Sequence, residues 1–190
     1  MKISVIYGSV RIGRQGIKAA RFVVNVLTER GHDVTLVDPR EYKLPLLEKR
    51  YKDYNKGEAP EMLENLAELF RNSDAFVVVS AEYNHSIPPA LSNLLDYFSE
   101  EYLFKPSAIV CYSGGPFGGV RAAVQLRAML GMLGMPGIPT IFPIPNVQDC
   151  FDETGKPLDE KYVKYIQKLI DELEWYAGAL SEARKKGLPY

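Results

Sequence analysis

The sequence predicts an α/β fold in which a parallel sheet of five strands is covered by helices on both faces. Five short segments are rich in apolar and β-branched residues, and longer segments with helical periodicity alternate with them. The short segments are apolar at almost every position, which is typical of strands buried on both faces. Because crossovers between parallel strands are right-handed and pass over the sheet, the intervening helices would cover it.

The expected strands are short apolar runs, each followed by a turn or loop. They cover residues 3–7, 34–37, 75–80 and 108–112, with a weaker fifth at 140–144. Valine and isoleucine recur in these runs, and β-branched side chains favour an extended backbone.

The expected helices lie between these strands and after the last one. They cover residues 17–30, 60–71, 89–100, 120–133 and a long final segment, 159–184. Two long loops remain, at 39–59 and 145–157, and loops of this length could cover a ligand.

Five alternating units suit the flavodoxin-like, doubly wound strand order 2-1-3-4-5, within a single domain over residues 1–190. In this order the chain reverses direction between the first and third strands. The loops after these strands, residues 8–16 and 81–88, therefore flank a crevice at the carboxyl edge of the sheet. We expect a ligand to bind there.

The composition is that of an ordinary globular protein, with 46% hydrophobic and 25% charged residues. A formal net charge of −1 and the lack of a long basic run indicate no general attraction to nucleic acid or acidic membranes. The N-terminus lacks the apolar core of a signal peptide, and no apolar segment approaches the ~18 residues that span a bilayer. We therefore expect a cytoplasmic protein that binds neither nucleic acid nor membranes.

The two cysteine residues form no metal-binding pattern and suit a reducing compartment. Cys111 lies within an apolar strand and is expected in the core, whereas Cys150 lies in a polar loop and is expected to be more exposed. Nothing near either residue indicates an activated thiolate or a metal site.

The loop after the first strand, Gly8-Ser9-Val10-Arg11-Ile12-Gly13-Arg14-Gln15-Gly16, can face an anion. Its amides and the helix start would supply donors, with a hydroxyl from Ser9 and a cation from Arg11 or Arg14. It is not a nucleoside-triphosphate loop, because Arg14-Gln15 stands where Lys-Ser/Thr is required, and Gly-x-Gly-x-x-Gly is absent. A tight turn with solvated arginines is the alternative.

Two more turns follow the third and fourth strands. The turn at 81–89 offers the Tyr83 ring, the Asn84 amide and the Ser86 hydroxyl, which can bind a flat, polar heteroaromatic ring. The turn at 113–119 is rich in glycine and permits close backbone approach to such a ring. In the alternative interpretation, the glycines serve sharp turns and Asn84 or Ser86 caps the following helix.

Together these motifs resemble the NAD(P)H-dependent FMN reductases, a family that includes chromate, quinone and azo-dye reductases. The matching segments, within about residues 1–145, are Gly8-Ser9-x-Arg11, Leu44-Pro45-Leu46, Glu82-Tyr83-Asn84-His85-Ser86-Ile87-Pro88 with Asn93 and Asp96, and Ser113-Gly114-Gly115-x-x-Gly118-Gly119-x-Arg121. The resemblance implies FMN and NAD(P)H as cofactors. It implies hydride transfer from reduced nicotinamide to the flavin, and onward transfer to a quinone, azo compound, metal oxyanion or free flavin.

The resemblance also implies the residues of the site. The FMN phosphate would bind Ser9, Arg11, Gln15, Gly16 and Ile17. The isoalloxazine ring would lie between Glu82, Tyr83, Asn84 and Ser86 on one edge and Ser113, Gly114, Gly115 and Gly119 on the other. No residue is assigned a catalytic role, and His85 is expected to be structural, with proton transfer by it left open.

The resemblance further implies a homodimer or homotetramer, with the helix at 89–100 near the subunit boundary. Leu91, Leu94, Leu95 and Phe98 would contribute apolar surface there, although some of them must simply cover the sheet. The choice between NADPH and NADH stays open, because Arg11, Arg14 and Arg121 are all candidate partners of a 2′-phosphate.

Two other functions remain open. A flavodoxin-like electron carrier would hold FMN without oxidising NADPH, but the strongly acidic surface that would favour it is absent here. A redox-sensing flavoprotein would instead bind a partner according to the state of its flavin, without substantial turnover.

Overall fold

The computed structural model describes residues 1–189, and its centre is a parallel sheet of five strands. The strands are β1 (Lys2–Tyr7), β2 (Asp33–Val37), β3 (Ala75–Ala81), β4 (Ser107–Tyr112) and β5 (Gly137–Ile144). Their order is β2-β1-β3-β4-β5, and each neighbouring pair is parallel. The predicted fold class and strand order are confirmed.

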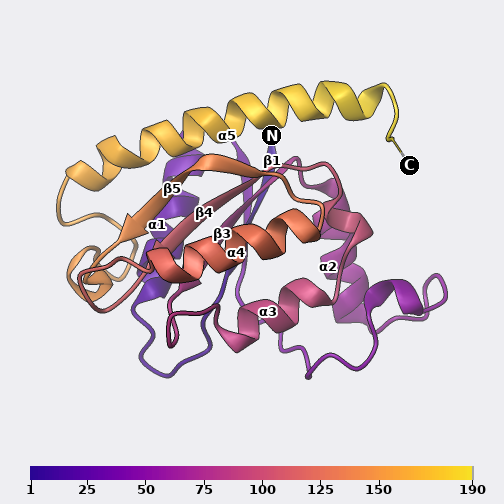
Figure 1. Cartoon of the computed structure of the whole chain (residues 1–190), viewed down its shortest axis with the longest axis horizontal. Coiled ribbons are helices and arrows are strands. Elements are labelled where there is room, and N and C mark those ends of the chain that lie inside the picture. The colour runs from indigo at the N-terminus through magenta and orange to yellow at the C-terminus, as the bar shows by residue number, and fades with distance from the viewer. Residues whose placement is uncertain (190) are drawn as a thin grey trace.

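Helices cover both faces of the sheet (Figure 1). On one face lie α1 (Gly16–Glu29) and α5 (Lys161–Lys185), and on the other lie α2 (Glu61–Asn72), α3 (Pro89–Asp96) and α4 (Val120–Met132). Successive side chains of a strand point to opposite faces. Ile3 and Val5 of β1 therefore join the core under α1 and α5, while Ile6 joins the core under the other helices. Within residues 1–189, no helix is both long and apolar enough to cross a membrane.

The third helix is shorter than predicted. It ends at Asp96, and a short 3₁₀ turn follows at Glu100–Tyr102. At Ser99 the backbone is not helical (φ −150°), and the Ser99 amide donates to the Glu101 carboxylate at 3.3 Å. Such side-chain bonds compete with the helical ladder. The same carboxylate lies 3.6 Å from Arg71 of α2, so a contact between two elements contributes to ending the helix.

The apolar residues of this segment lie inside the chain. Leu91, Leu94, Leu95 and Phe98 are at most 2% exposed and cover the sheet. Contrary to the sequence-based expectation, these side chains are not available to a second subunit.

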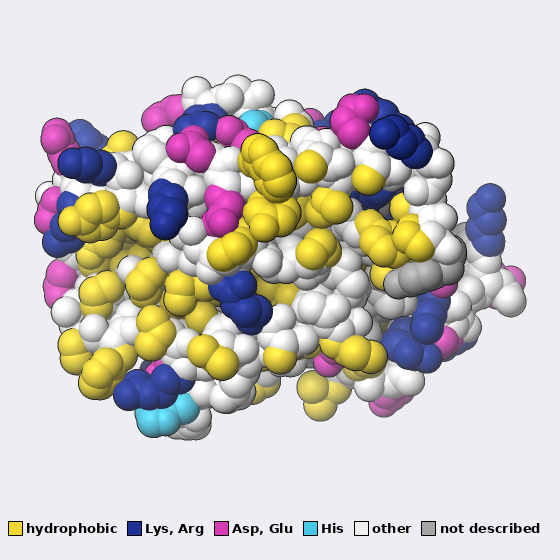
Figure 2. All heavy atoms as spheres, turned by 45° about the horizontal axis from the view of Figure 1, so that its top comes forward, with side chains coloured by type: hydrophobic (Ala, Val, Ile, Leu, Met, Phe, Trp, Pro, Cys, Tyr) yellow, Lys and Arg dark blue, Asp and Glu magenta, His cyan; other side chains and the backbone are white. Residues whose placement is uncertain are grey.

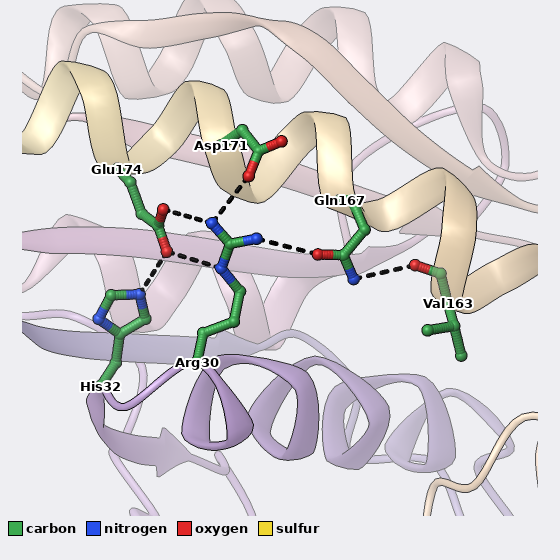
Figure 3. Close-up of polar contacts among 6 residues, drawn as sticks. All are labelled: Arg30, His32, Val163, Gln167, Asp171 and Glu174. Atoms are coloured by element: carbon green, nitrogen blue, oxygen red, sulfur yellow. Dashed lines mark hydrogen bonds and ion pairs between the residues drawn. The ribbon is translucent and has the colours of Figure 1, made fainter.

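A polar network joins the end of α1 to α5 (Figure 3). The Arg30 guanidinium donates to both carboxylate oxygens of Glu174 and to Gln167, and it lies 2.7 Å from Asp171. The His32 ring lies 2.8 Å from Glu174. The three α5 residues are three or four positions apart and share one face of the helix. The network therefore links α5 to the end of α1, and both helices pack on the same apolar core.

Candidate functional site

The carboxyl edge of the sheet carries a cavity of about 260 Å³ between the loops that follow β1, β3, β4 and β5. This edge is where an open α/β sheet binds ligands. The cavity is lined by Ser9, Arg11, Ile12, Gly13, Arg14, Gln15, Gly16, Ala81, Glu82, Tyr83, Tyr112, Ser113, Gly114, Val147 and Gln148. The three turns that the sequence singled out therefore meet at one site.

The loop after β1 presents free backbone donors to this cavity. Within the described chain, no protein acceptor takes the amides of residues 14–17, which lead into α1. The positive end of the helix dipole adds to these donors, so the position favours an anion. The Ser9 hydroxyl lies 2.6 Å from the Tyr83 hydroxyl and thereby connects the first loop to the second.

Gly16 allows α1 to begin directly against β4. A Cβ atom on Gly16 would lie 1.9 Å from the Tyr112 ring, and both residues are buried. No larger residue fits without a shift of the ring or the helix. The start of α1 and the end of β4 consequently meet at the cavity.

The two arginines of the first loop have different surroundings. Arg14 donates to the Ser9 carbonyl at 2.7 Å and forms a two-pronged ion pair with Asp38. The Arg11 guanidinium lies 5.7 Å from the centre of the Tyr83 ring, and in residues 1–189 it has no carboxylate or carbonyl acceptor. Arg11 is exposed. Of these two cations, Arg11 is thus the one free to meet an anion in the cavity.

The loop after β3 contains a tight two-residue turn. The amides and carbonyls of Tyr83 and Ser86 bond to each other at 3.0 and 2.9 Å. The residues between them, Asn84 and His85, have φ values of 50° and 62°. This is the backbone of a type I′ turn, in which asparagine is favoured at the first central position. Both central residues are exposed, so the turn projects their side chains outward.

Neither Asn84 nor Ser86 caps the following helix, so the capping alternative is wrong. The N-cap position of α3 is occupied by Pro88, and no side chain bonds to the helix start. Ser86 instead donates to the Gln125 side chain at 2.7 Å, and Gln125 donates to the His85 carbonyl at 2.8 Å. The turn is therefore held by α4.

Glu82 performs the capping role that the alternative interpretation gave to Asn84 or Ser86, but for a different helix. Its carboxylate accepts the amides of Arg121 and Ala122 in the first turn of α4, at 3.0 and 3.3 Å. The Arg121 guanidinium lies 3.4 Å from Glu82 and 4.4 Å from the centre of the Phe117 ring. Negative charge at a helix start is stabilising. Arg121, like Arg14, already has a carboxylate partner.

The loop after β4 brings free amides to the opposite side of the cavity. Among the described residues, the amides of Gly114 and Gly115 have no protein acceptor. The Ser113 hydroxyl donates to the Gly115 carbonyl at 2.9 Å. Gly119 has a φ of 80°, and a Cβ there would lie 2.7 Å from the Tyr112 backbone. The close packing of the start of α4 on β4 therefore requires glycine at position 119.

Most of the predicted site residues line the cavity. These are Ser9, Arg11, Gln15, Gly16, Glu82, Tyr83, Ser113 and Gly114. Outside its lining are Ile17, Asn84, Ser86, Gly115 and Gly119. The lining also includes Ile12, Gly13 and Arg14 of the predicted anion-binding loop, of which Arg14 was expected as one of two candidate cations, and Ala81, Tyr112, Val147 and Gln148, which were not assigned to the site. Ala81 ends β3 and is the first residue of the predicted turn 81–89, Tyr112 ends β4 just before the predicted turn 113–119, and Gln148 lies in the loop 145–157 that could cover a ligand.

Comparison with known proteins places the chain in a family. Residues 1–149 match the family of NADPH-dependent FMN reductases. The chain belongs to this family. It is 30% identical to an NAD(P)H-dependent FMN reductase of Pseudomonas aeruginosa over 185 residues, which cover 95% of this chain and 97% of that protein. It is also 32% identical to a quinone reductase of Pseudomonas putida over 176 residues, which cover 89% and 90% of the two chains.

A solved structure shares the fold. The flavoenzyme NAD(P)H:(acceptor) oxidoreductase FerB of Paracoccus denitrificans superimposes with a TM-score of 0.73 at 23% identity, over 95% of this chain and 97% of that one. The predicted family, the oxidoreductase class, and FMN with NAD(P)H as cofactors are confirmed.

The cavity of this FMN reductase suits the chemistry of its cofactor. Free amides at the start of α1, the Ser9 hydroxyl and the Arg11 guanidinium are donors that a phosphate accepts. On the other side, the free amide of Gly114, followed by that of Gly115 just outside the lining, matches the acceptor atoms of a flavin ring. The residues present therefore fit FMN.

Tyr112 lines the cavity of the FMN reductase and contacts the buried Tyr7. The Tyr112 hydroxyl donates to the Tyr7 hydroxyl at 3.0 Å, and the two rings are stacked with centres 6.3 Å apart. Burial raises the pKa of Tyr112 well above its ordinary value, and the adjacent Tyr7 adds to this effect. Burial also raises the pKa of Tyr7. Both phenols therefore stay protonated at neutral pH, and each keeps a proton that it can donate in a hydrogen bond.

Both cysteines are buried and unpaired. Burial raises the pKa of the Cys111 thiol to about 12. Cys150 is also buried, contrary to expectation, because its thiol bonds to the Pro145 and Asn146 carbonyls and lies 2.9 Å from the Tyr162 hydroxyl. Its loop is polar in sequence, but the contact with α5 encloses it.

Asn93, part of the family motif, lies outside the cavity lining. Its side chain donates to the Pro45 carbonyl at 2.7 Å and accepts the Leu47 amide at 2.9 Å. It therefore fixes the Leu44-Pro45-Leu46 segment of the long loop against α3.

Proposed function

We propose that this FMN reductase binds the FMN phosphate at the start of α1 and the isoalloxazine ring between the loops after β3 and β4. The observation that carries the proposal is a set of free amides around one cavity: those of residues 14–16 on one side and that of Gly114 on the other, all four residues being part of its lining. An anion and a flat ring with acceptor atoms would satisfy both sets at once.

The bound FMN would supply the redox chemistry, taking hydride from reduced nicotinamide and passing electrons to an acceptor. The chain's own residues would bind and orient it. Arg11 and the α1 amides hold the phosphate, and the Gly114 and Gly115 amides offset negative charge on the ring. No proton-transferring side chain is required, and His85 is exposed on its turn.

A quinone or an azo compound is the acceptor we propose. Relatives with similar length are named as a quinone reductase and, at 29% identity over 98% of both chains, as an NADPH azoreductase of a Bacillus species. Such aromatic acceptors could follow the nicotinamide onto one open ring face. This alternation predicts parallel lines in double-reciprocal plots, and intersecting lines would contradict it.

The test is to titrate FMN into the purified protein and to follow the flavin absorption spectrum and fluorescence. FMN should bind, and NADPH added without oxygen should then bleach its absorption. A quinone should restore the absorption in the next step. Absence of FMN binding would contradict the proposed site, while binding without bleaching would favour an electron carrier.

We also propose that the FMN reductase forms a homodimer or homotetramer in the cytoplasm. Figure 2 shows hydrophobic side chains gathered on the side of the molecule where α4 and α5 flank the edge strand β5. Val124 and Met132 of α4 and Trp175 of α5 are 71%, 89% and 69% exposed. Light scattering at micromolar concentration should give a multiple of 21.4 kDa. The buried free thiols are compatible with a reducing compartment.

A further inference from the structure

We propose that Asp38 is a positioning residue for FMN binding. Asp38 fixes the Arg14 side chain against the backbone of the phosphate loop, residues 8–16. We call this Asp38–Arg14 ion pair the brace. In this position Arg14 sets the shape of the loop and does not itself bind the phosphate. This inference rests on the proposed function, because it concerns the same phosphate site.

The contacts of Arg14 join three parts of the chain. Its Nη1 atom donates to the Ser9 carbonyl at 2.7 Å and to Asp38 Oδ1 at 2.6 Å, and its Nη2 atom donates to Asp38 Oδ2. The guanidinium also lies 5.1 Å from the centre of the Tyr7 ring. A two-pronged pairing of this kind fixes the orientation of the guanidinium as well as its position.

Asp38 is itself held in place. It follows β2 directly, its side chain accepts the Arg40 amide at 2.9 Å, and its carbonyl accepts the amides of Glu41 and Tyr42. The side chains of Asp38 and Arg14 are 5% and 11% exposed. Little water can therefore replace either partner, and an unpaired charge at this position would be costly.

The Asp38–Arg14 pair determines which polar groups of the loop after β1 remain available to a ligand. With the Ser9 carbonyl tied to Arg14, the Ser9 hydroxyl is directed to Tyr83 at 2.6 Å, and the loop is bridged to the end of the neighbouring strand β2. A carboxylate beside an anion site would otherwise repel the anion, but Arg14 neutralises it. Direct cationic contact with the phosphate is then left to Arg11, which lines the same cavity.

The experiment compares FMN with riboflavin, which lacks the phosphate. Dissociation constants are measured by fluorescence titration for the wild-type protein, Asp38→Asn and Arg14→Gln. Because each change breaks a charged hydrogen-bond network, we expect FMN to bind about tenfold or more weakly in both variants. Riboflavin should change by no more than about twofold, since it lacks the phosphate that the loop after β1 would bind.

The control is Asp53→Asn, which removes an aspartate that pairs with Arg50 on an exposed 3₁₀ turn outside the cavity lining. It should leave both dissociation constants unchanged. In the double variant Asp38→Asn/Arg14→Gln, the loss should be close to that of the worse single variant, because both changes remove one brace.

Several results would overturn the inference. Tighter FMN binding by Asp38→Asn would mean that Arg14, once released, is a phosphate ligand. An equal loss of FMN and riboflavin would mean a general structural role. If Asp38→Asn does not fold, Arg14→Lys keeps the charge but lacks the forked geometry, and an unchanged preference for FMN in that variant would overturn the inference. Failure of the wild-type protein to bind FMN would contradict the proposed function itself.

Discussion

Replacing Gly16 with alanine should disrupt the junction of α1 and β4. The new methyl group would lie 1.9 Å from the Tyr112 ring, whereas carbon atoms in contact are normally about 3.5 Å apart. The ring or the helix start must therefore move by roughly 1.5 Å. Overpacking of a core costs about 1–3 kcal/mol. For a chain of this length, that corresponds to a fall in melting temperature of about 2–12 °C.

The measurement is thermal and urea unfolding of the FMN-free protein, with Gly178→Ala as the matched control. Gly178 lies inside α5, is exposed, and has open space where a Cβ would be. Alanine there should stabilise the protein by about 0.5–1 kcal/mol. The same type of change thus has opposite expected signs at the two sites. If Gly16→Ala is as stable as the wild-type protein, the inferred contact between α1 and Tyr112 is wrong.

Three further changes have distinct expected outcomes. Glycine in Asn84→Gly accepts the positive φ of this position, so the FMN-free protein should keep its stability. FMN should bind more weakly, because the variant loses the amide side chain that we expect to contact the ring. Equal binding by the variant and the wild-type protein would exclude that role. Glu82→Gln removes the charge that caps α4 and should lower the unfolding free energy by about 1 kcal/mol in urea titrations, with no loss if the cap is unimportant. Burial opposes ionisation of Glu174, but Arg30 and neighbouring donors outweigh it and lower its pKa below the ordinary 4.5. The resulting stability is present above that value and is lost as the pH falls through the folded-state pKa, so wild type and Glu174→Gln should differ at pH 7 and converge in acid. A constant difference would contradict this.

The sequence predicted the main elements because their signals are local. Apolar runs with β-branched residues gave the positions of the strands, and helical periodicity gave the helices between them. Boundaries were less accurate where contacts with other elements decide them, as in α3, which ends four residues early. There the Glu101 carboxylate bonds to the Ser99 amide and lies beside Arg71, and no local pattern reports such contacts.

The same distinction applies to the cavity. Its glycine-rich and polar turns were visible in the sequence, and the strand order predicted that they would meet. The roles of individual side chains were not visible. Helix capping was one of two interpretations of Asn84, but the chain turns tightly at that position, and Glu82 instead caps a helix that begins far along the sequence.

The sequence by itself determined the alternation of strands and helices, the doubly wound sheet and the family, because these follow from local periodicity and short motifs. Only the tertiary structure decided which charged groups remain free for a ligand. Arg14 and Asp38 are 24 positions apart, yet they follow the adjacent strands β1 and β2 and form an ion pair in which their charges offset each other. Arg11, three positions earlier, keeps its charge toward the cavity. Pairing of this kind depends on distances in space between segments, which composition and spacing along the chain do not encode.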